Sequence, residues 1–362
     1  MSARPFNDRR PVLIMAGGTG GHIFPGLAVA DVLRAQDVPV AWLGARGGME
    51  TQVVPAHDIA LHTVPVGGLR GKGWATRLRA PLMLASALVA SLAALRRLRP
   101  RSVLSMGGYV AGPGGIAARL LGVPLLVHEQ NSVAGYTNRR LASFARRVMT
   151  GFADALPRGE WVGNPVRSTI AALPPPAERM RNRLGPPRLL VLGGSLGARA
   201  LNVAVPKALA LLPPAARPQV LHQCGRRGLE EARAAYAAAG VDAEVVPFIE
   251  DMASAYGQAD LAVCRAGALT LAELTAAGLG ALLVPFPHAV DDHQTRNAEA
   301  LVAAGAAELT KETDLDIQTL AHRLDALLQD PPRRLAMAAA ARALAKPDAA
   351  TAIARACLEV AA

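Results

Sequence analysis

The sequence has 362 residues, of which 51% are hydrophobic and 19% charged, with 34 glycines and 27 prolines. This composition excludes an intrinsically disordered chain, a coiled coil and a collagen-like repeat, and the length suggests two domains at roughly 150 residues each. The three cysteines, Cys224, Cys264 and Cys357, form no CxxC pair. A structural zinc site and a disulfide scaffold are therefore disfavoured, and a reducing compartment fits best.

The formal net charge of +11 is concentrated in the first half of the chain. Residues 1–165 carry 19 Lys and Arg against 8 Asp and Glu, whereas residues 166–362 carry 20 of each. This excess predicts an anionic partner for the first half alone. Aromatic residues make up only 4% of the chain. Few platforms for stacking bases are therefore available, and nucleic acid is not expected as that partner.

The first predicted elements are a buried strand at 11–16, a glycine turn at 17–22 and a helix at 23–34. The residues before them are polar and basic, and the apolar stretch at 12–16 is too short for a signal-peptide core. No export is expected.

A basic and apolar segment follows at 70–101. Its uncharged run, Ala80–Leu95, has 16 residues, fewer than the roughly 20 that a spanning helix needs, so we do not expect it to cross a bilayer. Two roles remain open: a surface that binds anionic lipid, or an ordinary core-packed helix with solvated ends. The basic residues that bracket the run are Arg70, Lys72, Arg77, Arg79, Arg96, Arg97, Arg99 and Arg101.

The pattern of strand, glycine turn and helix returns three times along the chain. Strands at 102–105, 188–192 and 261–264 precede turns at 107–112, 193–198 and 265–270, and the second of these turns leads into a helix at 199–212. Further buried strands are predicted at 125–127 and 281–284. We therefore predict an α/β fold with two doubly wound parallel sheets, joined by the proline-rich connector within 165–187.

The C-terminal region is predicted to be helical. Asp314 and Asp316 resemble a metal-binding DxD pair, but they directly precede a predicted helix at 317–328 and are expected to cap it. A last separate helix is expected to begin after Pro347.

A glycine turn at a helix N-terminus presents backbone N–H groups and a positive dipole end, which suit a phosphate or another oxyanion. The first turn lacks the third glycine of a dinucleotide fingerprint, and neither this turn nor the one at 193–198 is followed by the Gly-Lys-Ser/Thr of a P-loop. Both observations disfavour nicotinamide cofactors and ATP hydrolysis. The glycines could also serve only to permit tight turns.

Three polar groups near these turns have two interpretations each. His22 could be a general base or a structural histidine. Glu273 could bind ribose hydroxyls or simply favour the start of its helix. The segment 291–294 could read hydroxyl groups or solvate a loop.

Six motifs, taken together and in order, resemble the bacterial MurG glycosyltransferases of glycosyltransferase family 28. The resemblance runs nearly end to end. The motifs are Gly17-Gly-Thr-Gly-Gly-His-Ile-Phe-Pro-Gly26, Gly107-Gly-Tyr-Val-Ala-Gly-Pro113, His128-Glu-Gln-Asn131, Gly163-Asn-Pro-Val-Arg167, Gly193-Gly-Ser-Leu-Gly-Ala198 and Cys264-Arg-Ala-Gly-Ala-Leu-Thr-Leu-Ala-Glu273.

The resemblance implies a GT-B fold, in which two Rossmann-like domains face one cleft. Residues 1–166 would form the acceptor-binding, membrane-facing domain, on which a helix at 348–362 packs back, and residues 167–347 the UDP-sugar domain. The implied activity is inverting transfer of N-acetylglucosamine from UDP-N-acetylglucosamine to the C4 hydroxyl of lipid I, forming lipid II, with no metal or other cofactor. A UDP-N-acetylglucosamine 2-epimerase on the same fold is the alternative.

The resemblance also assigns roles to residues. His22 is the expected catalytic base and Glu129 its rival. The expected donor site consists of Thr19, Gly20, Gly21, Asn131, Arg167, Ser195, Ile249, Arg265, Ala268, Leu269, Thr270, Leu271, Ala272, Glu273 and Gln294. Gly107, Gly108, Tyr109 and His128 are expected on the acceptor side. Leu196 stands where many relatives carry Gln, and the choice between His293 and Gln294 for sugar recognition stays open.

The expected location is peripheral, at the cytoplasmic face of the cell membrane. The implied partners are UDP-N-acetylglucosamine, the undecaprenyl-diphosphate-linked lipid I, anionic membrane lipids and other proteins of cell-wall synthesis.

Overall fold

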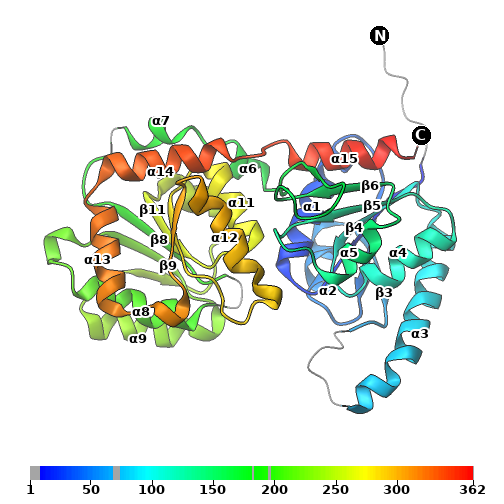
Figure 1. Cartoon of the computed structure of the whole chain (residues 1–362), viewed down its shortest axis with the longest axis horizontal. Coiled ribbons are helices and arrows are strands. Elements are labelled where there is room, and N and C mark those ends of the chain that lie inside the picture. Colours follow the sequence, from blue (N-terminus) through cyan, green and yellow to red (C-terminus); the bar gives the residue numbers. More distant parts are fainter. Residues whose placement is uncertain (1–8, 68–73, 182, 195–196, 362) are drawn as a thin grey trace, which may run out of the picture. The chain divides into compact units, whose positions relative to one another are not determined.

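The chain forms two compact units in this computed structural model, which describes residues 9–67, 74–181, 183–194 and 197–361 (Figure 1). The first unit is built from residues 1–165 and 348–362, and the second from residues 166–347. Each unit contains one sheet in which every strand pair is parallel.

The sheet of the first unit has seven strands in the order β3-β2-β1-β4-β5-β6-β7. The order reverses direction between β1 and β4. The elements are β1 (Val12–Ala16), α1 (Gly20–Arg34), β2 (Val40–Ala45), α2 (Glu50–Val53), β3 (Ala60–Val64), α3 (Trp74–Leu98), β4 (Ser102–Gly107), α4 (Ala111–Leu120), β5 (Leu125–Glu129), α5 (Tyr136–Ala142), β6 (Arg147–Thr150), β7 (Glu160–Trp161) and α15 (Ala349–Glu359).

The sheet of the second unit has six strands in the order β10-β9-β8-β11-β12-β13, which reverses between β8 and β11. The elements are α6 (Ser168–Ala171), α7 (Pro176–Met180), β8 (Arg188–Leu192), α8 (Arg199–Ala210), β9 (Gln219–Gln223), α9 (Leu229–Ala239), β10 (Glu244–Val246), α10 (Met252–Gln258), β11 (Leu261–Cys264), α11 (Ala268–Ala277), β12 (Ala281–Leu283), α12 (His293–Ala303), β13 (Ala307–Leu309), α13 (Ile317–Leu328) and α14 (Pro331–Ala343).

The central strand β1 is apolar and buried along its whole length, because helices cover both faces of the sheet. In β1, Ile14 belongs to the core cluster that includes α1 and α15, while Leu13 and Met15 belong to the cluster on the opposite face. Successive side chains of a strand point to opposite faces, so both sets are buried. The predicted α/β class with two doubly wound parallel sheets is therefore confirmed.

The C-terminal helix α15 packs on the first unit, beside α1 (Figure 1). Ile353 and Cys357 are fully buried in the same core cluster as Leu27 of α1. The hydroxyl of Ser102 in β4 donates to the carbonyl oxygen of Cys357 at 2.8 Å, and Arg147 of β6 pairs with Glu359 at 2.8 Å. Residues from the two ends of the chain thus complete one core.

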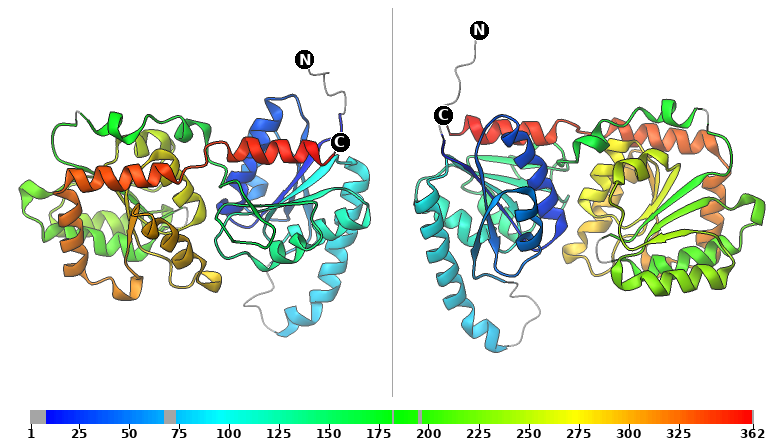
Figure 2. Two further views of the ribbon diagram at one scale, coloured as in Figure 1. Left: turned by 45° about the horizontal axis from the view of Figure 1, so that its top comes forward. Right: turned by 180° about the vertical axis from the view of Figure 1, so that it is seen from behind.

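Helix α3 extends beyond the sheet of the first unit at its N-terminal end (Figure 2). Toward its C-terminal end, Ala87, Ser91 and Leu95 are buried, whereas Leu82 is 76% and Val89 65% exposed. The segment 81–98 is long and apolar enough to cross a membrane by length and composition alone, and 17% of it is buried. The length of this segment therefore does not exclude a membrane span, although the 16-residue uncharged run alone was too short for one.

The structure corrects one member of the basic set around this run. Arg101 is only 4% exposed, because it lies where the chain enters the buried strand β4. Arg96, Arg97 and Arg99 are exposed. Arg70 and Lys72 lie outside the described residues, as do the side chains of Arg77 and Arg79.

Two predicted helix boundaries also shift. α1 begins at Gly20 rather than at residue 23, because the glycines already take helical conformation in the first turn. α8 ends at Ala210, two residues before the predicted end.

The predicted capping role of Asp316 is confirmed, since its carboxylate accepts the backbone N–H of Thr319 at 2.9 Å.

Candidate functional site

The glycine turns singled out in the sequence lie at the two positions where the strand order reverses. The turns after β1 and β4 occupy the reversal of the first sheet, and those after β8 and β11 the reversal of the second. In open α/β sheets, ligands bind at this position, outside the carboxyl ends of the strands. Each unit therefore carries one candidate ligand site.

The two turns of the first unit are in close contact. A Cβ atom on Gly108 would lie 2.3 Å from the carbonyl oxygen of Gly17, and Gly108 has a φ of +85°. Gly107 also has a positive φ, and a Cβ there would lie 3.0 Å from the ring of His22. Side chains at these positions would separate the two turns.

Glu50 is a buried carboxylate that supports the first turn, and sequence reasoning missed it. It is fully buried and accepts the backbone N–H of Gly18 at 3.2 Å and that of Ala45 at 2.7 Å. A Cβ on Gly17 or Gly48 would lie 2.4 Å from its carboxylate oxygens. The only sequence signal is a lone acid two residues after a Gly-Gly pair.

His22 lies in the first turn of α1, between these two glycine turns. Its Nδ1 is 2.9 Å from Oε1 of Gln130, the residue after β5, and the ring is partly exposed. Thr19 is the exposed residue that precedes α1, and Gly20 and Gly21 form the start of this helix. Gln130 was not singled out as a site residue, although it lies inside the quoted motif 128–131.

Glu129 is fully engaged in supporting the loop after β5. Its two oxygens accept hydrogen bonds from the backbone N–H groups of Asn131 and Gly135 and from the side-chain amides of Asn131 and Asn138, at 3.0 to 3.2 Å. It is only 1% exposed. This arrangement leaves Glu129 poorly placed to take a proton from a substrate, so the geometry favours His22 of the two rivals.

The expected acceptor-side residues differ in exposure. Tyr109 is 51% exposed at the turn after β4, whereas His128 is fully buried. Nε2 of His128 lies 2.9 Å from the carbonyl oxygen of Gly163 and its Nδ1 lies 3.1 Å from Nε2 of Gln130. His128 therefore supports the site through buried hydrogen bonds, and it has no exposed surface that could contact an acceptor substrate.

Glu273 of α11 forms a buried cluster in the second unit. One oxygen accepts two hydrogen bonds from Arg167, at 2.8 and 3.3 Å, and the other accepts the hydroxyl of Tyr256 at 3.0 Å. Burial, with the nearby carboxylate, raises the pKa of Tyr256 well above its usual range, so that its hydroxyl remains a donor. Sequence reasoning identified Glu273 and Arg167 but missed Tyr256, because α10 carries none of the motifs that pointed to the site.

Gln294 of α12 has a fixed side-chain orientation. Its Oε1 accepts the backbone N–H groups of Ala266 at 3.2 Å and Phe286 at 2.9 Å. Both partners can only donate, so the amide oxygen must face them and the amide nitrogen is directed elsewhere. Gln294 can therefore donate hydrogen bonds to hydroxyl oxygens of a ligand.

Arg265 is largely committed to contacts within the second unit. Its guanidinium donates to the carbonyl oxygens of Val284 and Pro285, forms an ion pair of 2.5 Å with Glu312 and lies over the ring of Phe286. Its side chain is 13% exposed. Arg167 is 48% exposed, and it is the more available of the two cations for an anionic ligand.

The remaining expected donor residues lie around the second reversal. Gly267 precedes α11, whose first residues are Ala268, Leu269, Thr270, Leu271 and Ala272. Ile249 follows β10 and is 9% exposed. Gly197 has a positive φ, and a Cβ there would lie 2.4 Å from the carbonyl oxygen of Cys224. Ser195 and Leu196 lie outside the described residues.

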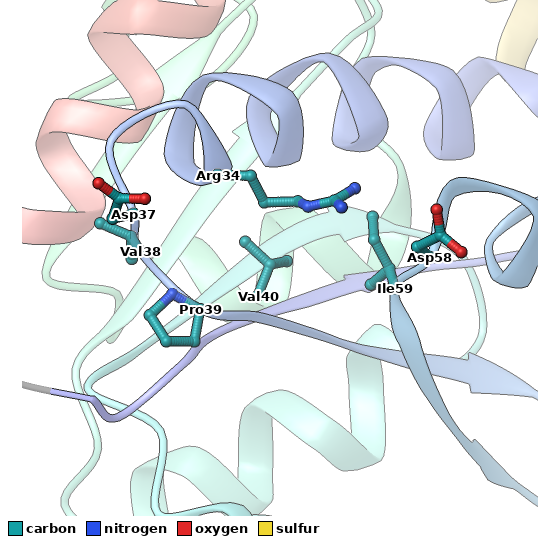
Figure 3. A pocket seen from close by; sticks show the side chains of 7 residues that line it. All are labelled: Arg34, Asp37, Val38, Pro39, Val40, Asp58 and Ile59. Atoms are coloured by element: carbon teal, nitrogen blue, oxygen red, sulfur yellow. The ribbon is translucent and has the colours of Figure 1, made fainter.

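Within the described ranges, no group of three or more His, Cys, Asp or Glu side chains could hold a metal ion. A hollow of about 330 Å³ in the first unit is lined by the end of α1 and the residues that lead into β2 and β3, among them Arg34, Asp37 and Asp58 (Figure 3). It lies at the amino ends of the strands, whereas the glycine turns lie at the carboxyl ends. None of the expected site residues lines it.

Comparisons with known proteins agree with the motifs. The model of the glycosyltransferase family 28 N-terminal domain matches residues 12–150, and that of the family 28 C-terminal domain matches residues 188–353. Over 352 residues the chain is 61% identical to the UDP-N-acetylglucosamine--N-acetylmuramyl-(pentapeptide) pyrophosphoryl-undecaprenol N-acetylglucosamine transferase of Xanthomonas axonopodis pv. citri (strain 306). The aligned residues are 97% of this chain and 82% of that protein.

Solved structures show the same relationship. The crystal structure of Acinetobacter baumannii MurG is 39% identical, with a TM-score of 0.85 over 97% of this chain and 99% of that one. The UDP-GlcNAc 2-epimerase from Neisseria meningitidis, solved with UDP-GlcNAc, reaches a TM-score of 0.65 at 12% identity, over 96% of this chain and 100% of that one. This second likeness shows a shared fold alone.

Proposed function

Because the chain belongs to glycosyltransferase family 28, we propose that it transfers N-acetylglucosamine from UDP-N-acetylglucosamine to the C4 hydroxyl of the N-acetylmuramyl-pentapeptide of lipid I, forming lipid II. The observation that carries the proposal is the 61% identity, over nearly the whole chain, to a transferase of that name. The two parallel-sheet units are those of the GT-B fold.

The donor would bind to the second unit. Three of the oxygen lone pairs of Glu273 are occupied by Arg167 and Tyr256, so one stays available for a ribose hydroxyl. The backbone at Ile249 would contact uracil, and the outward amide of Gln294 would donate to hydroxyls of the sugar. The turn at 193–198 and the N-terminus of α8 would hold the diphosphate, with Arg167 nearby.

The reaction is a displacement at the anomeric carbon with inversion. His22 would accept the proton of the attacking hydroxyl, and the charge that develops on UDP would be stabilised by the N–H groups of the turn after β8 and by Arg167. Such preorganised donors act as an oxyanion hole does. Thr19, Gly20, Gly21 and Asn131 would contribute from the first unit.

The test of the function is transfer of labelled N-acetylglucosamine from its UDP donor to a lipid I analogue, with and without a chelator. Product of the mass of lipid II in both arms is expected. No product would overturn the function, and loss of product only with the chelator would overturn the metal-free mechanism. Consumption of UDP-N-acetylglucosamine without an acceptor would instead favour the 2-epimerase, which at present rests on the shared fold alone.

We also propose that α3 attaches the first unit to the cytoplasmic face of the cell membrane, as a peripheral contact. Leu82, Leu84 and Val89 are exposed on this helix, and Arg96, Arg97 and Arg99 are exposed at its end. Each basic residue near an anionic surface contributes up to about 1 kcal/mol, less at high salt. The buried contacts of Ala87, Ser91 and Leu95 keep one face of the helix on the protein core, which favours a peripheral position over a span.

Cosedimentation with vesicles that contain anionic lipid tests this membrane role. Replacement of Arg96, Arg97 and Arg99 by Gln should reduce the bound fraction, most clearly at low salt. Replacement of Arg226, Arg227 and Arg233 in the second unit removes the same charge and should leave the bound fraction unchanged. Equal binding by wild type and the α3 variant would refute the proposal.

A further inference from the structure

A buried chain of hydrogen bonds in the first unit connects His22 to the protein interior. It runs from the carbonyl oxygen of Gly163 through His128 and Gln130 to His22, with successive distances of 2.9, 3.1 and 2.9 Å. His128 lies in β5, Gln130 directly follows it, and His22 lies in the first turn of α1. The position of every proton in this chain can be deduced from its two ends.

The first end is the carbonyl oxygen of Gly163, which can only accept. Nε2 of His128 must therefore carry the proton that it donates there. Complete burial lowers the pKa of His128 to about 4, so the ring is neutral at physiological pH. A neutral imidazole carries one proton, and Nδ1 of His128 is consequently an acceptor.

The orientation of the Gln130 side chain follows from two independent acceptors. Its Nε2 lies 3.1 Å from Nδ1 of His128 and 3.1 Å from the backbone carbonyl oxygen of the same residue. Since both partners accept, the group that faces them must be the NH2 of the amide. The amide oxygen of Gln130 is thereby directed at Nδ1 of His22.

We propose that Gln130 is a positioning residue, which holds His22 in the tautomer protonated on Nδ1 and so leaves the lone pair on Nε2 for the acceptor hydroxyl. An amide oxygen can only accept, so Nδ1 of His22 must donate to it, and the free ring nitrogen is fixed by that bond. Within the described part of the chain, Nε2 of His22 has no hydrogen-bond partner. This inference rests on the proposed function.

The proton balance of the step is simple. The hydroxyl oxygen of the acceptor forms a bond to the anomeric carbon, and the bond from that carbon to the diphosphate oxygen breaks, with its electron pair leaving on UDP. The hydroxyl proton moves to Nε2 of His22. The resulting imidazolium still donates from Nδ1 to Gln130, so the ring does not have to turn during the reaction.

The neutral amide distinguishes this arrangement from a histidine paired with a carboxylate. A carboxylate at the same place would favour the protonated ring and reduce its availability as a base. Gln130 fixes the tautomer and the ring orientation without adding charge. Its own position is fixed by His128 and by Asn164, whose side-chain amide donates to the backbone carbonyl oxygen of Gln130 at 2.9 Å.

The wild-type protein provides a direct test by 15N NMR of labelled histidines. The chain has eight histidines, and comparison with His22→Asn assigns the ring signals of His22. We expect His22 in the form protonated on Nδ1. A ring protonated on Nε2 would overturn the proposal without the need for any further variant.

The second test is Gln130→Leu, which removes the side-chain hydrogen bonds to His22 and to His128. We expect kcat to fall by about 100-fold or more, the range in which a misplaced general base acts, while KM for UDP-N-acetylglucosamine stays within about threefold. The ring signals of His22 should shift toward a mixture of tautomers. In Gln130→Glu the carboxylate can still accept from Nδ1 of His22, so the tautomer should be kept. Because the added charge favours the protonated ring, kcat should lie between the value of Gln130→Leu and that of the wild type.

Tyr236→Phe is the matched control. It removes a 3.0 Å hydrogen bond to the buried His222 of the second unit, and it should alter neither kcat nor the His22 signals. A Gln130→Leu protein that binds UDP normally and retains wild-type kcat would overturn the positioning role. Absence of transfer by the wild type would instead overturn the proposed function, so the two failures are distinguishable.

Discussion

Arg167 and Tyr256 hold the carboxylate of Glu273 in place before any ligand binds. The three side chains come from α10, α11 and the residue before α6, and Glu273 is only 7% exposed. A carboxylate held in this way loses little side-chain entropy when a ribose hydroxyl binds. The acid is thus prepared for its expected role by contacts that are already part of the fold.

Glu273→Gln should weaken the donor site. The amide keeps the size of the side chain but loses the charge-assisted bonds to Arg167, which are stronger than neutral ones. We expect KM for UDP-N-acetylglucosamine to rise about tenfold, corresponding to roughly 1.4 kcal/mol, with a smaller effect on kcat. Titration calorimetry with UDP measures the same loss. Tyr256→Phe, which leaves the charge in place, should have a smaller effect, and unchanged UDP affinity in Glu273→Gln would contradict the assignment.

His22→Asn tests the general base. The asparagine side chain can still bond to Gln130 but cannot accept a proton, so kcat should fall by about 100-fold to 10,000-fold in saturating substrates. UDP affinity should be unchanged, because the expected donor contacts do not include the side chain of His22. Glu129→Gln is the comparison for the rival base. If Glu129→Gln abolished turnover in a folded protein and His22→Asn did not, the assignment of the base would be reversed.

At the scale of elements, the close contact between the glycine turns after β1 and β4 contributes to the stability of the first unit. Gly108→Ala would place a methyl group 2.3 Å from the carbonyl oxygen of Gly17, at a φ of +85°. Gly122→Ala is the matched control, since Gly122 also has a positive φ but no atom within 4 Å of the added Cβ. Urea unfolding should show about 1 to 2 kcal/mol lost in the control, the cost of the left-handed conformation, and a larger loss in Gly108→Ala. Equal losses would mean that the two turns can separate without cost.

Helix α15 contributes to stability through its buried face. Ile353→Ala should destabilise the protein by about 2 to 5 kcal/mol, because Ile353 is fully buried and the cavity is enclosed by α1 and the sheet. Arg355→Ala, on the exposed face of the same helix, should change the free energy of unfolding by less than about 0.5 kcal/mol. Denaturant melts of both variants provide the measurement, and similar values for the two would show that α15 does not pack as described.

Strands and glycine turns could be predicted from the sequence because both depend on local patterns. The strands at 188–192 and 261–264 and the helix at 317–328 have the predicted bounds. Long-range partners could not be predicted in this way. Gln130 and Glu50 bond to groups in segments far away in the sequence, and Tyr256 carries no motif that marks it. Arg101 looked like a surface cation only because its neighbours in sequence are basic.

At the scale of the whole molecule, each unit contains a buried neutral histidine. Burial lowers the pKa of His128 in the first unit and of His222 in the second to about 4, from an ordinary value of 6.5. The unfolded chain therefore binds more protons than the folded protein between pH 6.5 and 4, and stability rises with pH across this window. Both units carry the same sensitivity to acid.

The expected result is a loss of stability as pH falls from 6.5 toward 4. At pH 5 the loss amounts to about 2 kcal/mol for each of the two histidines. Urea unfolding at pH 7 and pH 5 measures it. His57→Gln changes an exposed histidine and should leave the pH dependence as in the wild type. A free energy of unfolding that is equal at pH 7 and pH 5 would show that these histidines do not remain neutral in the folded protein.

The return of α15 to the first unit has a consequence for synthesis on the ribosome. Residues 166–347, which form the second unit, are translated after the body of the first unit and before α15. At about 5 to 20 residues per second, the face of α1 that α15 covers stays open for roughly 10 to 40 seconds. The second unit is one continuous segment and can complete its core as it emerges, whereas the first unit finishes last. During that interval the nascent chain exposes apolar side chains such as Leu27, which gives a chaperone a defined surface and a defined time at which to bind.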